Sequence, residues 1–223
     1  MRHSPHHQYI SPAIYAQYRT ITPLMRRTLT GRLIDIGCGD MPFRDYVGSQ
    51  VTAYDSLDVA PRSEDVTFVG DVHDMRMIAS ADYDAAVCFE VLEHVADPFQ
   101  AMSEIARILR PGGTFIISVP HLSRLHDVPH DYYRFTRYGL RHMLEQAGFE
   151  VLDMHESGGI FCFLGHQVSI MALSLAWPVP GVRQIVRFLN QWLVTRLCYQ
   201  LDRCFKFSGM FAMGYVAVSR KRG

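Results

Sequence analysis

The sequence predicts an α/β fold of the Rossmann-like, doubly wound type, with a mostly parallel seven-stranded sheet and helices on both faces. Short apolar runs alternate with segments of helical periodicity from residue 31 onward, which is typical of a parallel sheet covered on both sides. One run, residues 33–36, breaks directly into a turn that contains Gly37 and Gly39. With 223 residues and 48% hydrophobic content, the chain can bury one large core.

The first predicted element is a helix over about residues 12–29. Ser11 and Pro12 supply an N-cap and a proline at the first helical position, and apolar side chains follow at helical spacing. Pro23 predicts a bend in this helix. Seven strands are expected near residues 32–36, 51–55, 66–69, 84–89, 114–119, 149–156 and 211–218. Helices fit between them near residues 41–47, 73–79, 97–109 and 137–147.

A long apolar insertion separates the last two strands. Residues 160–177 are strongly apolar but slightly short for a membrane span. After a proline-rich turn, a second helix from Val182 combines an apolar face with four arginines: Arg183, Arg187, Arg196 and Arg203. Three roles stay open for residues 160–205: a helical cap over the substrate site, a homodimer surface, or a peripheral membrane contact. The sequence favours the cap and the dimer surface over the membrane.

Charge is unevenly distributed although the net charge is zero. Residues 1–34 carry five arginines and no acid, residues 157–223 carry eight lysines or arginines with Asp202 as the one acid, and residues 35–156 carry 21 acids against nine bases. Either the basic ends pack against the acidic middle, or they face an anionic surface or substrate. The five cysteines lack metal-ligand spacing, and the first residues lack an apolar signal segment, so we expect a cytoplasmic protein, with membrane association as an option.

The glycine turn predicts a nucleoside site. Glycines let the backbone approach a ligand, and Asp55 ends the next apolar run eighteen residues after Gly37. An acid at the tip of the neighbouring strand accepts hydrogen bonds from ribose hydroxyls. The third glycine of the dinucleotide fingerprint is missing, because Pro42 stands in its place. Asp35 and Asp40 flank the turn, which favours a cationic ligand over a pyrophosphate.

The run Asp35-Ile36-Gly37-Cys38-Gly39 resembles the first motif of class I S-adenosylmethionine-dependent methyltransferases. Residues 69–72 resemble the acidic end of that family's third strand, residues 83–95 its fourth strand and following turn, and residues 109–117 its junction between helix and fifth strand. The matches cover about residues 30–156. They are closest in pattern to the small-molecule, ubiquinone-pathway-like (type 11) group, although Met41 stands where that motif commonly has glycine.

The resemblance implies S-adenosyl-L-methionine as the cofactor and S-adenosyl-L-homocysteine as its product. It implies that the backbone of the glycine turn holds the amino-acid end, Asp55 the ribose and Asp71 the adenine amine, with Asp35 balancing positive charge nearby. The expected cofactor-binding residues are Asp35, Gly37, Cys38, Gly39, Asp55, Ser56, Asp71, Val72 and Glu90. The expected domain is single: an N-terminal helical arm (1–30), a cofactor-binding core (31–157), the helical insertion (158–208), and a last strand with a basic tail (209–223).

The acceptor site is expected in the loops that follow the fourth and fifth strands. The first loop supplies Glu90, Glu93 and His94, and the second, residues 120–135, concentrates His, Asp, Tyr and Arg. Histidine titrates near neutral pH, so the candidate bases are His130, His126 and, in the turn after the fourth strand, His94. The expected substrate contacts are His121, Asp131, Tyr132, Tyr133 and Arg134. The spacing of His126 and His130 resembles that of metal ligands, but the proline between them argues against a regular helix, and no metal is expected.

The leading functional hypothesis is methyl transfer to a small-molecule or lipid- or sugar-linked acceptor, at oxygen, by in-line displacement. Two alternatives stay open. One is a non-catalytic S-adenosylmethionine-binding module whose helical insertion recruits a partner; the other is a nicotinamide-dependent oxidoreductase, disfavoured by the missing third glycine. Nucleic acid is not an expected partner, because the middle of the chain is acidic and the arginines of the insertion are scattered.

Overall fold

The structure, a computed structural model, describes residues 11–205 and 209–223. The chain divides into two compact units. The larger unit, which we call the sheet unit, runs from Thr22 to His155 and includes Tyr215–Gly223. The smaller unit, which we call the helical unit, contains Glu156–Gly214 together with the residues up to Ile21. The first ten residues of the predicted N-terminal arm and residues 206–208 of the predicted insertion lie outside the described residues.

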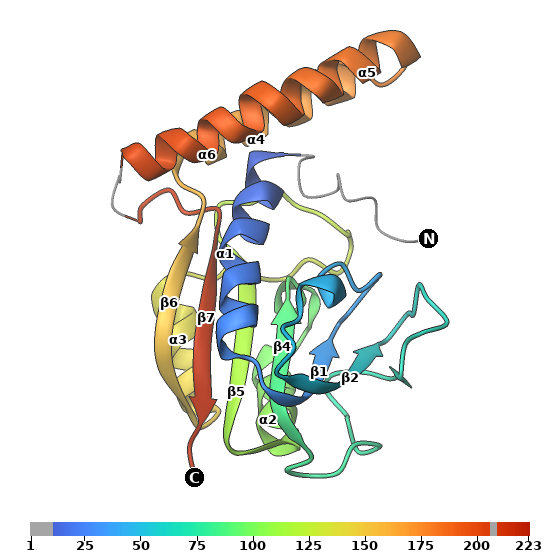
Figure 1. Ribbon diagram of the computed structural model, residues 1–223, viewed down its shortest axis with the longest axis vertical. Coiled ribbons are helices and arrows are strands. Elements are labelled where there is room, and N and C mark those ends of the chain that lie inside the picture. The colour runs from blue at the N-terminus through green and yellow to red at the C-terminus, as the bar shows by residue number, and fades with distance from the viewer. Residues whose placement is uncertain (1–10, 206–208) are drawn as a thin grey trace. The chain divides into compact units, whose positions relative to one another are not determined.

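Seven strands form one sheet in the order β3-β2-β1-β4-β5-β7-β6 (Figure 1). The strands are β1 Gly31–Ile36, β2 Val51–Asp58, β3 Phe68–Val69, β4 Tyr83–Phe89, β5 Leu109–Pro120, β6 Phe149–Ser157 and β7 Gly214–Lys221. The pairs β1–β2, β1–β4, β2–β3 and β4–β5 are parallel, and β7 runs antiparallel. The predicted doubly wound, mostly parallel sheet is confirmed.

The core of the sheet unit is centred on β1, β4 and β5. In these strands most side chains are buried, because both faces of a central parallel strand are covered. Ile34 lies opposite Ala86, which in turn lies opposite Phe115. The Phe115 and Phe149 rings pack 5.2 Å apart. This rigid centre holds the carboxyl ends of the strands, from which the functional loops start.

Three helices accompany the sheet: α1 Pro12–Thr28, α2 Pro98–Ile108 and α3 Arg137–Gln146. In Figure 1, the second half of α1, from Thr22 on, lies in front of the sheet, with α2 and α3 behind it. The Asp97 carboxylate caps α2 by accepting from the N–H of Phe99 and of Gln100, each at 3.1 Å. The Thr136 hydroxyl caps α3 in the same way. These caps begin both helices close to where the sequence predicts them.

Two other predicted helices are wrong. The segment 41–47 contains only a short 3-10 turn, Arg44–Tyr46, preceded by Met41 at φ 55°. The segment 73–79 is a chain of turns. There the Asp71 carboxylate accepts from the N–H of His73 and the Asp74 carboxylate from the N–H of Arg76. Such local side-chain bonds give the backbone an alternative to the helix.

The helical unit consists mainly of α4 Ile160–Ala176, α5 Pro180–Leu189, a π-helical turn Asn190–Val194 and α6 Thr195–Cys204. Ala16, Cys162 and Met213 form a small buried core within it. The Asp202 carboxylate caps α4 by accepting from the N–H groups of Gly159, Phe161 and Cys162 at 2.8 to 2.9 Å. Among the described residues, no helix is long and apolar enough to cross a membrane.

Candidate active site

The carboxyl ends of the parallel strands bring the candidate residues to one edge of the sheet. Gly37 follows β1, Asp58 ends β2, and Glu90 follows β4. Asp71 comes two residues after β3, and the histidine-containing loop follows β5. In open α/β sheets, ligands bind at this edge.

The glycine turn after β1 exposes its backbone. Gly37 has φ 68°, and a Cβ there would overlap the side chain of Val91, so only glycine fits this position without strain. Gly39 has φ 52°, and a Cβ there would meet no atom within 4 Å. A ligand can therefore approach the backbone at Gly39, as the sequence predicts.

The acid at the tip of β2 is Asp58, and the prediction that placed Asp55 there is wrong. Asp55 lies opposite Ile34 within β2. Its carboxylate accepts from the Arg32 guanidinium, with Nε at 2.9 Å, and from the Tyr83 hydroxyl at 2.9 Å. Asp55 is therefore held in a structural ion pair. Asp58 ends the strand instead, and its Oδ2 accepts from the N–H of Gly39 at 2.8 Å.

Three predicted cofactor residues around the turn are buried. Asp35 accepts from the Tyr54 hydroxyl, and burial raises its pKa to about 6. Burial, with Asp35 nearby, raises the pKa of the Cys38 thiol to about 12, so this thiol stays neutral. Ser56 is almost fully buried, and its hydroxyl accepts from the N–H of Thr67 at 3.1 Å. The structure corrects the prediction that Ser56 contacts the cofactor. The Ser56 side chain instead ties β2 to the segment before β3.

Asp71 and Val72 follow β3 at the same edge. Asp71 is exposed, and its Oδ1 lies 2.7 Å from Nδ1 of His73. Val72 is buried, so only its backbone can reach a ligand. The structure thus places the Asp71 carboxylate after the third strand, where a bound nucleoside could reach it.

Glu90 has a strained backbone conformation and a raised pKa. It has φ 54°, in the left-handed region that disfavours side chains, directly after β4. Its Oε1 accepts from the Ser118 hydroxyl at 2.8 Å. Burial and the neighbouring Glu93 carboxylate raise the pKa of Glu90 to about 8. The raised pKa favours the protonated form of this acid.

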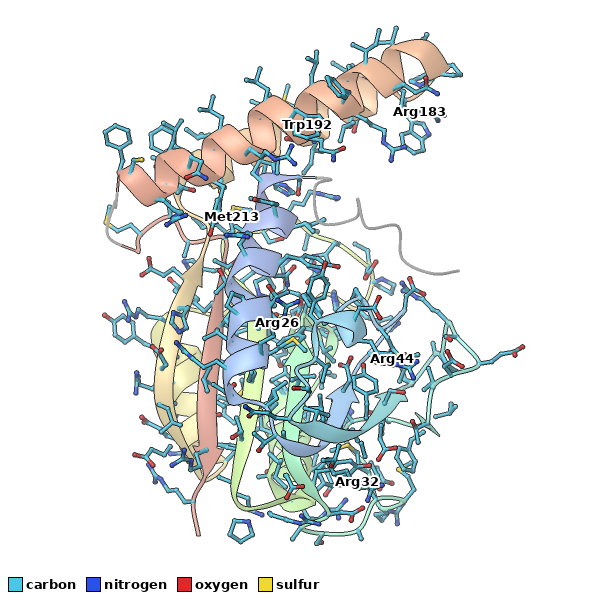
Figure 2. The ribbon with its side chains drawn as sticks, in the orientation of Figure 1. Arg26, Arg32, Arg44, Arg183, Trp192 and Met213 are labelled. Carbon is cyan, nitrogen blue, oxygen red and sulfur yellow. The ribbon has the colours of Figure 1, made fainter. Side chains whose placement is uncertain are left out.

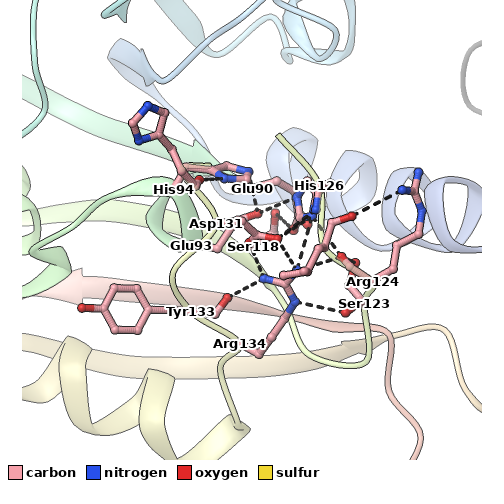
Figure 3. Close-up of polar contacts among 12 residues, drawn as sticks. Glu90, Glu93, His94, Ser118, Ser123, Arg124, His126, Asp131, Tyr133 and Arg134 are labelled. Atoms are coloured by element: carbon pink, nitrogen blue, oxygen red, sulfur yellow. Dashed lines mark hydrogen bonds and ion pairs between the residues drawn. The ribbon is translucent and has the colours of Figure 1, made fainter. Parts of the chain in front are cut away.

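A buried carboxylate faces two histidines next to Glu90 (Figure 3). Glu93 is fully buried, and neither of its carboxylate oxygens has a hydrogen-bond partner. Its Oε1 lies 3.6 Å from Nε2 of His126 and 3.7 Å from Nε2 of His94. The two imidazole rings meet edge to face with centroids 4.7 Å apart. The Glu93 carboxylate raises the pKa of His126 above its usual value.

This cluster also has the composition of a cation site. Glu93, His94 and His126 each offer one ligand atom, and these atoms lie within 4.8 Å of one another. In the sequence, only His126 and His130 have a spacing that resembles that of metal ligands, and no metal is expected from it. The combination of two imidazoles and one carboxylate arises from two loops that follow neighbouring strands, so chain spacing alone does not reveal it.

The loop after β5 is held by an ion pair that the sequence assigned to substrate. Both oxygens of the buried Asp131 carboxylate accept from the Arg134 guanidinium, and Oδ2 also accepts from the N–H of His126 at 2.8 Å. The Arg134 guanidinium holds the pKa of Asp131 well below its usual range. Arg134 donates further to the carbonyls of Ser123 and Arg124. These bonds give Asp131 and Arg134 a role in folding the loop, and their expected contact with substrate stays a prediction.

The remaining loop residues are more exposed. The His130 ring is exposed, and its Nδ1 lies 3.0 Å from the Tyr132 hydroxyl. The Tyr133 hydroxyl donates to the carbonyl of Ala96 at 2.9 Å. The His121 ring is half-buried beside Tyr215, with centroids 5.3 Å apart. The structure brings His94 and His126 together but leaves the His130 and His121 rings apart from that pair.

The sequence analysis missed one residue of this edge, Asp58, and gave no specific role to a second, Glu93. Asp58 was missed because the second strand runs three residues past the predicted end; the apolar Leu57 before it is the signal that the strand continues. Glu93 is distinguished by its burial without a hydrogen bond and by its two histidine neighbours, and the sequence shows neither because both follow from the packing of two loops.

The residues at this edge fit S-adenosylmethionine. Carboxylates at the ends of β2 and β3, Asp58 and Asp71, can accept hydrogen bonds from ribose hydroxyls and an adenine amine. The open backbone at Gly39 leaves room for the amino-acid end. Asp35, Asp58 and Asp71 make the surroundings acidic, which suits a ligand with a sulfonium and an ammonium group.

Comparisons with known proteins show the family to which the chain belongs. The model of a family described as "Methyltransferase domain" matches residues 13–154, which is more than half of the chain. A ubiquinone biosynthesis O-methyltransferase from Xanthomonas campestris pv. campestris is 34% identical over 103 residues, 39% of this chain and 42% of that protein. A probable S-adenosylmethionine-dependent methyltransferase from Mycolicibacterium smegmatis is 39% identical over 82 residues, 34% of this chain and 32% of that protein. The aligned parts thus span less than half of either relative.

Solved structures share the fold at low sequence identity. A SAM-dependent methyltransferase from Archaeoglobus fulgidus aligns with a TM-score of 0.59 and 16% identity, over 95% of both chains. Haemonchus contortus phosphoethanolamine N-methyltransferase 2, solved in complex with S-adenosyl-L-methionine, aligns with a TM-score of 0.56 and 15% identity, over 97% of this chain and 56% of that chain. With the family match over residues 13–154 and the strand order of the sheet, the chain belongs to the class I S-adenosylmethionine-dependent methyltransferases.

Proposed function

We propose that this protein transfers a methyl group from S-adenosylmethionine to an oxygen of a small-molecule acceptor, which includes lipid- and sugar-linked alcohols, with His126 as the base. The cofactor supplies a methyl group on a sulfonium, which needs no further activation. The protein must then align the acceptor, exclude water and take up the acceptor's proton.

The observation that carries the proposal is the position of His126. Its Nε2 faces the buried Glu93 carboxylate, which can stabilise the imidazolium that forms when the base takes a proton. As the acceptor oxygen attacks the methyl carbon, the carbon–sulfur bond breaks and its electron pair stays on sulfur. The acceptor's proton passes to His126. His94 lies beside this pair and lends its second ring to the same acceptor site.

Cofactor binding is assigned to the edge formed by β1, β2 and β3. In the proposal Asp58 takes the ribose role that the sequence gave to Asp55, Asp71 accepts from the adenine amine, and the backbone at Gly39 contacts the amino-acid end. Glu90, when protonated, can donate as well as accept a hydrogen bond near the cofactor.

A matched pair of variants tests the cofactor assignment. Asp58→Asn should weaken S-adenosylmethionine binding by about tenfold or more, because a charged acceptor is lost. Asp55→Asn should lower stability but leave the affinity of the folded protein unchanged, because Asp55 pairs with Arg32. Isothermal titration calorimetry measures both, with NAD as the comparison ligand. Equal loss of affinity in the two variants, or tight NAD binding, contradicts the assignment.

A second pair tests the base. His126→Ala should abolish the release of S-adenosylhomocysteine with a panel of phenols, sugars and polyprenyl-linked alcohols, while S-adenosylmethionine binding is kept. His130→Ala is the control, since its exposed ring lies apart from Glu93. Full activity of His126→Ala, or loss confined to His130→Ala, contradicts the proposed role. Absence of transfer to every acceptor with binding intact would favour a non-catalytic binding module.

A further inference from the structure

The helical unit carries an exposed apolar surface of the kind that normally contacts a partner. On α4 the large apolar side chains Leu164, Val168, Met171 and Leu175 recur at spacings of four, three and four, and all are exposed, Leu175 by 80%. Such spacing places them along one side of the helix. Side chains of this size are normally buried in a protein without partners, and a continuous exposed row marks an interaction surface.

We call α4 the first arm of a helical hairpin, and α5, the π-helical turn and α6 its second arm. The second arm also carries a row of exposed apolar side chains. Along the helical run from α5 through the π-helical turn to α6, large apolar side chains are again exposed. They are Ile185, Phe188, Leu189, Trp192, Leu193 and Leu197. Figure 2 shows side chains standing out along this helix, with Arg183 and Trp192 labelled on it.

The fully buried residues of the two arms are small or polar instead. The buried residues of α4 are Cys162, Gly165, Ser169 and Ala176, and those of the second arm are Asn190 and Thr195. The Ser169 hydroxyl donates to the Gly165 carbonyl at 2.7 Å and bonds the side-chain oxygen of Asn190. A Cβ on Gly165 would overlap the Cys198 sulfur, so the helices pack closely.

This distribution is the reverse of a water-exposed hairpin. In water, large apolar side chains pack between helices and polar ones face out. Helices in contact with lipid use small residues and buried polar bonds between them, and turn large apolar side chains outward. The hairpin follows the second pattern. The second arm combines exposed apolar side chains with arginines, which is the composition of helices that lie in the plane of the bilayer interface.

The positive charge of the hairpin favours anionic lipids. Between residues 157 and 205 the charged side chains are Arg183, Arg187, Arg196, Arg203 and the acid Asp202, and the Asp202 carboxylate is engaged by the N-terminus of α4. Arg183 lies over the Trp177 ring at 4.9 Å and Arg196 over the Trp192 ring at 3.7 Å. Arginine beside tryptophan is typical of the level of lipid headgroups. A second copy of the same surface would bring arginines against arginines.

We propose that the hairpin of α4, α5 and α6 docks in the plane of an anionic lipid bilayer, with its exposed apolar side chains among the acyl chains and its arginines at the headgroups. This inference does not depend on the chemistry at the sheet edge. It reverses the order that the sequence alone favoured, in which a cap or a dimer surface ranked above the membrane.

The chain carries its own probe for this contact. Its two tryptophans, Trp177 and Trp192, both lie in the hairpin and are both exposed. Full-length protein mixed with vesicles of phosphatidylcholine and phosphatidylglycerol in equal parts should show a blue shift of tryptophan emission and should sediment with the vesicles. Vesicles of phosphatidylcholine alone should bind at least tenfold less, and added salt should weaken the anionic case. No spectral shift, or equal binding to both vesicles, overturns the proposal.

Matched variants separate this surface from general stickiness. Phe188→Glu should lower vesicle binding by tenfold or more, while Tyr138→Glu, at an even more exposed aromatic position on α3, should leave it unchanged. Arg183→Glu with Arg187→Glu should also lower it about tenfold or more, against Arg62→Glu with Arg222→Glu as the control. If the controls fall as far, or if light scattering shows a dimer that Phe188→Glu dissociates without vesicles, the surface serves another partner and the proposal fails.

Discussion

At the scale of single residues, the charge of His126 depends on one buried carboxylate. The Glu93 carboxylate raises the pKa of His126, and a base works only when deprotonated. Glu93→Gln should therefore lower this pKa and move the acid limb of the profile of kcat/KM against pH to lower pH. His130→Gln should leave the limb in place. If the acid limb of the Glu93→Gln profile lies at the same pH as that of the parent, Glu93 has no part in the proposed mechanism.

Glu90 gives a second residue-scale prediction, for stability. Its pKa is about 8 in the folded protein and near 4.5 when unfolded, so between these values the unfolded chain ionises first and stability falls as pH rises. Glu90→Gln removes this slope. We expect the variant to gain about 1 to 3 kcal/mol in unfolding free energy relative to the parent between pH 5 and pH 8, measured by urea unfolding. Parallel pH profiles would contradict the raised pKa.

The same residues show what could be predicted from sequence. Gly37 and Gly39 are recognisable because the turn is local, and their φ values match it. The acid at the end of the second strand was predicted to be Asp55 and is Asp58, because the end of a strand depends on pairing with its neighbours. The pairing of Glu93 with His94 and His126 was not predicted because the two histidines come from separate loops, and only the folded sheet brings these loops together.

At the scale of elements, long periodic segments were predicted well and short ones poorly. The helices α2 and α3 and the central strands formed where apolar spacing and caps agreed. The segment 73–79 did not form its helix, because Asp71 and Asp74 bond to nearby backbone and Met75 N–H donates to the Glu104 carboxylate. Local competition and a distant partner thus overrode the pattern.

The cap of α4 provides a prediction at this scale. The Asp202 carboxylate accepts three backbone N–H groups at the start of α4. Asp202→Ala should destabilise the helical unit by about 1 to 3 kcal/mol, because buried donors lose a charged acceptor. In Asp202→Ala, hydrogen exchange should be faster than in the parent in a peptide covering residues 157–170. The exchange rate in Asp202→Asn should lie between those of the parent and Asp202→Ala. Unchanged exchange there would show that the cap contributes nothing.

At the scale of the whole molecule, the division into two units predicts how the cofactor stabilises the chain. Every residue assigned to S-adenosylmethionine lies in the sheet unit. Ligand at one hundred times its dissociation constant should stabilise that unit by about 2.7 kcal/mol, which corresponds to a rise of about 5 to 10 °C in Tm for a chain of this size. Differential scanning fluorimetry measures the rise, and NAD should give none.

Hydrogen exchange then shows where that stabilisation acts. Amides at the carboxyl ends of β1, β2 and β4 should be protected by S-adenosylmethionine, because a ligand slows exchange in the parts that must open to release it. Amides of α4 and α6 should exchange as before, since the hairpin carries no assigned cofactor residue. Asp58→Asn should lose the protection at the sheet edge, whereas Asp55→Asn should keep it. Strong protection of the hairpin by S-adenosylmethionine alone would instead give the helical unit a role in closing over the site, and would restore the cap that the sequence favoured.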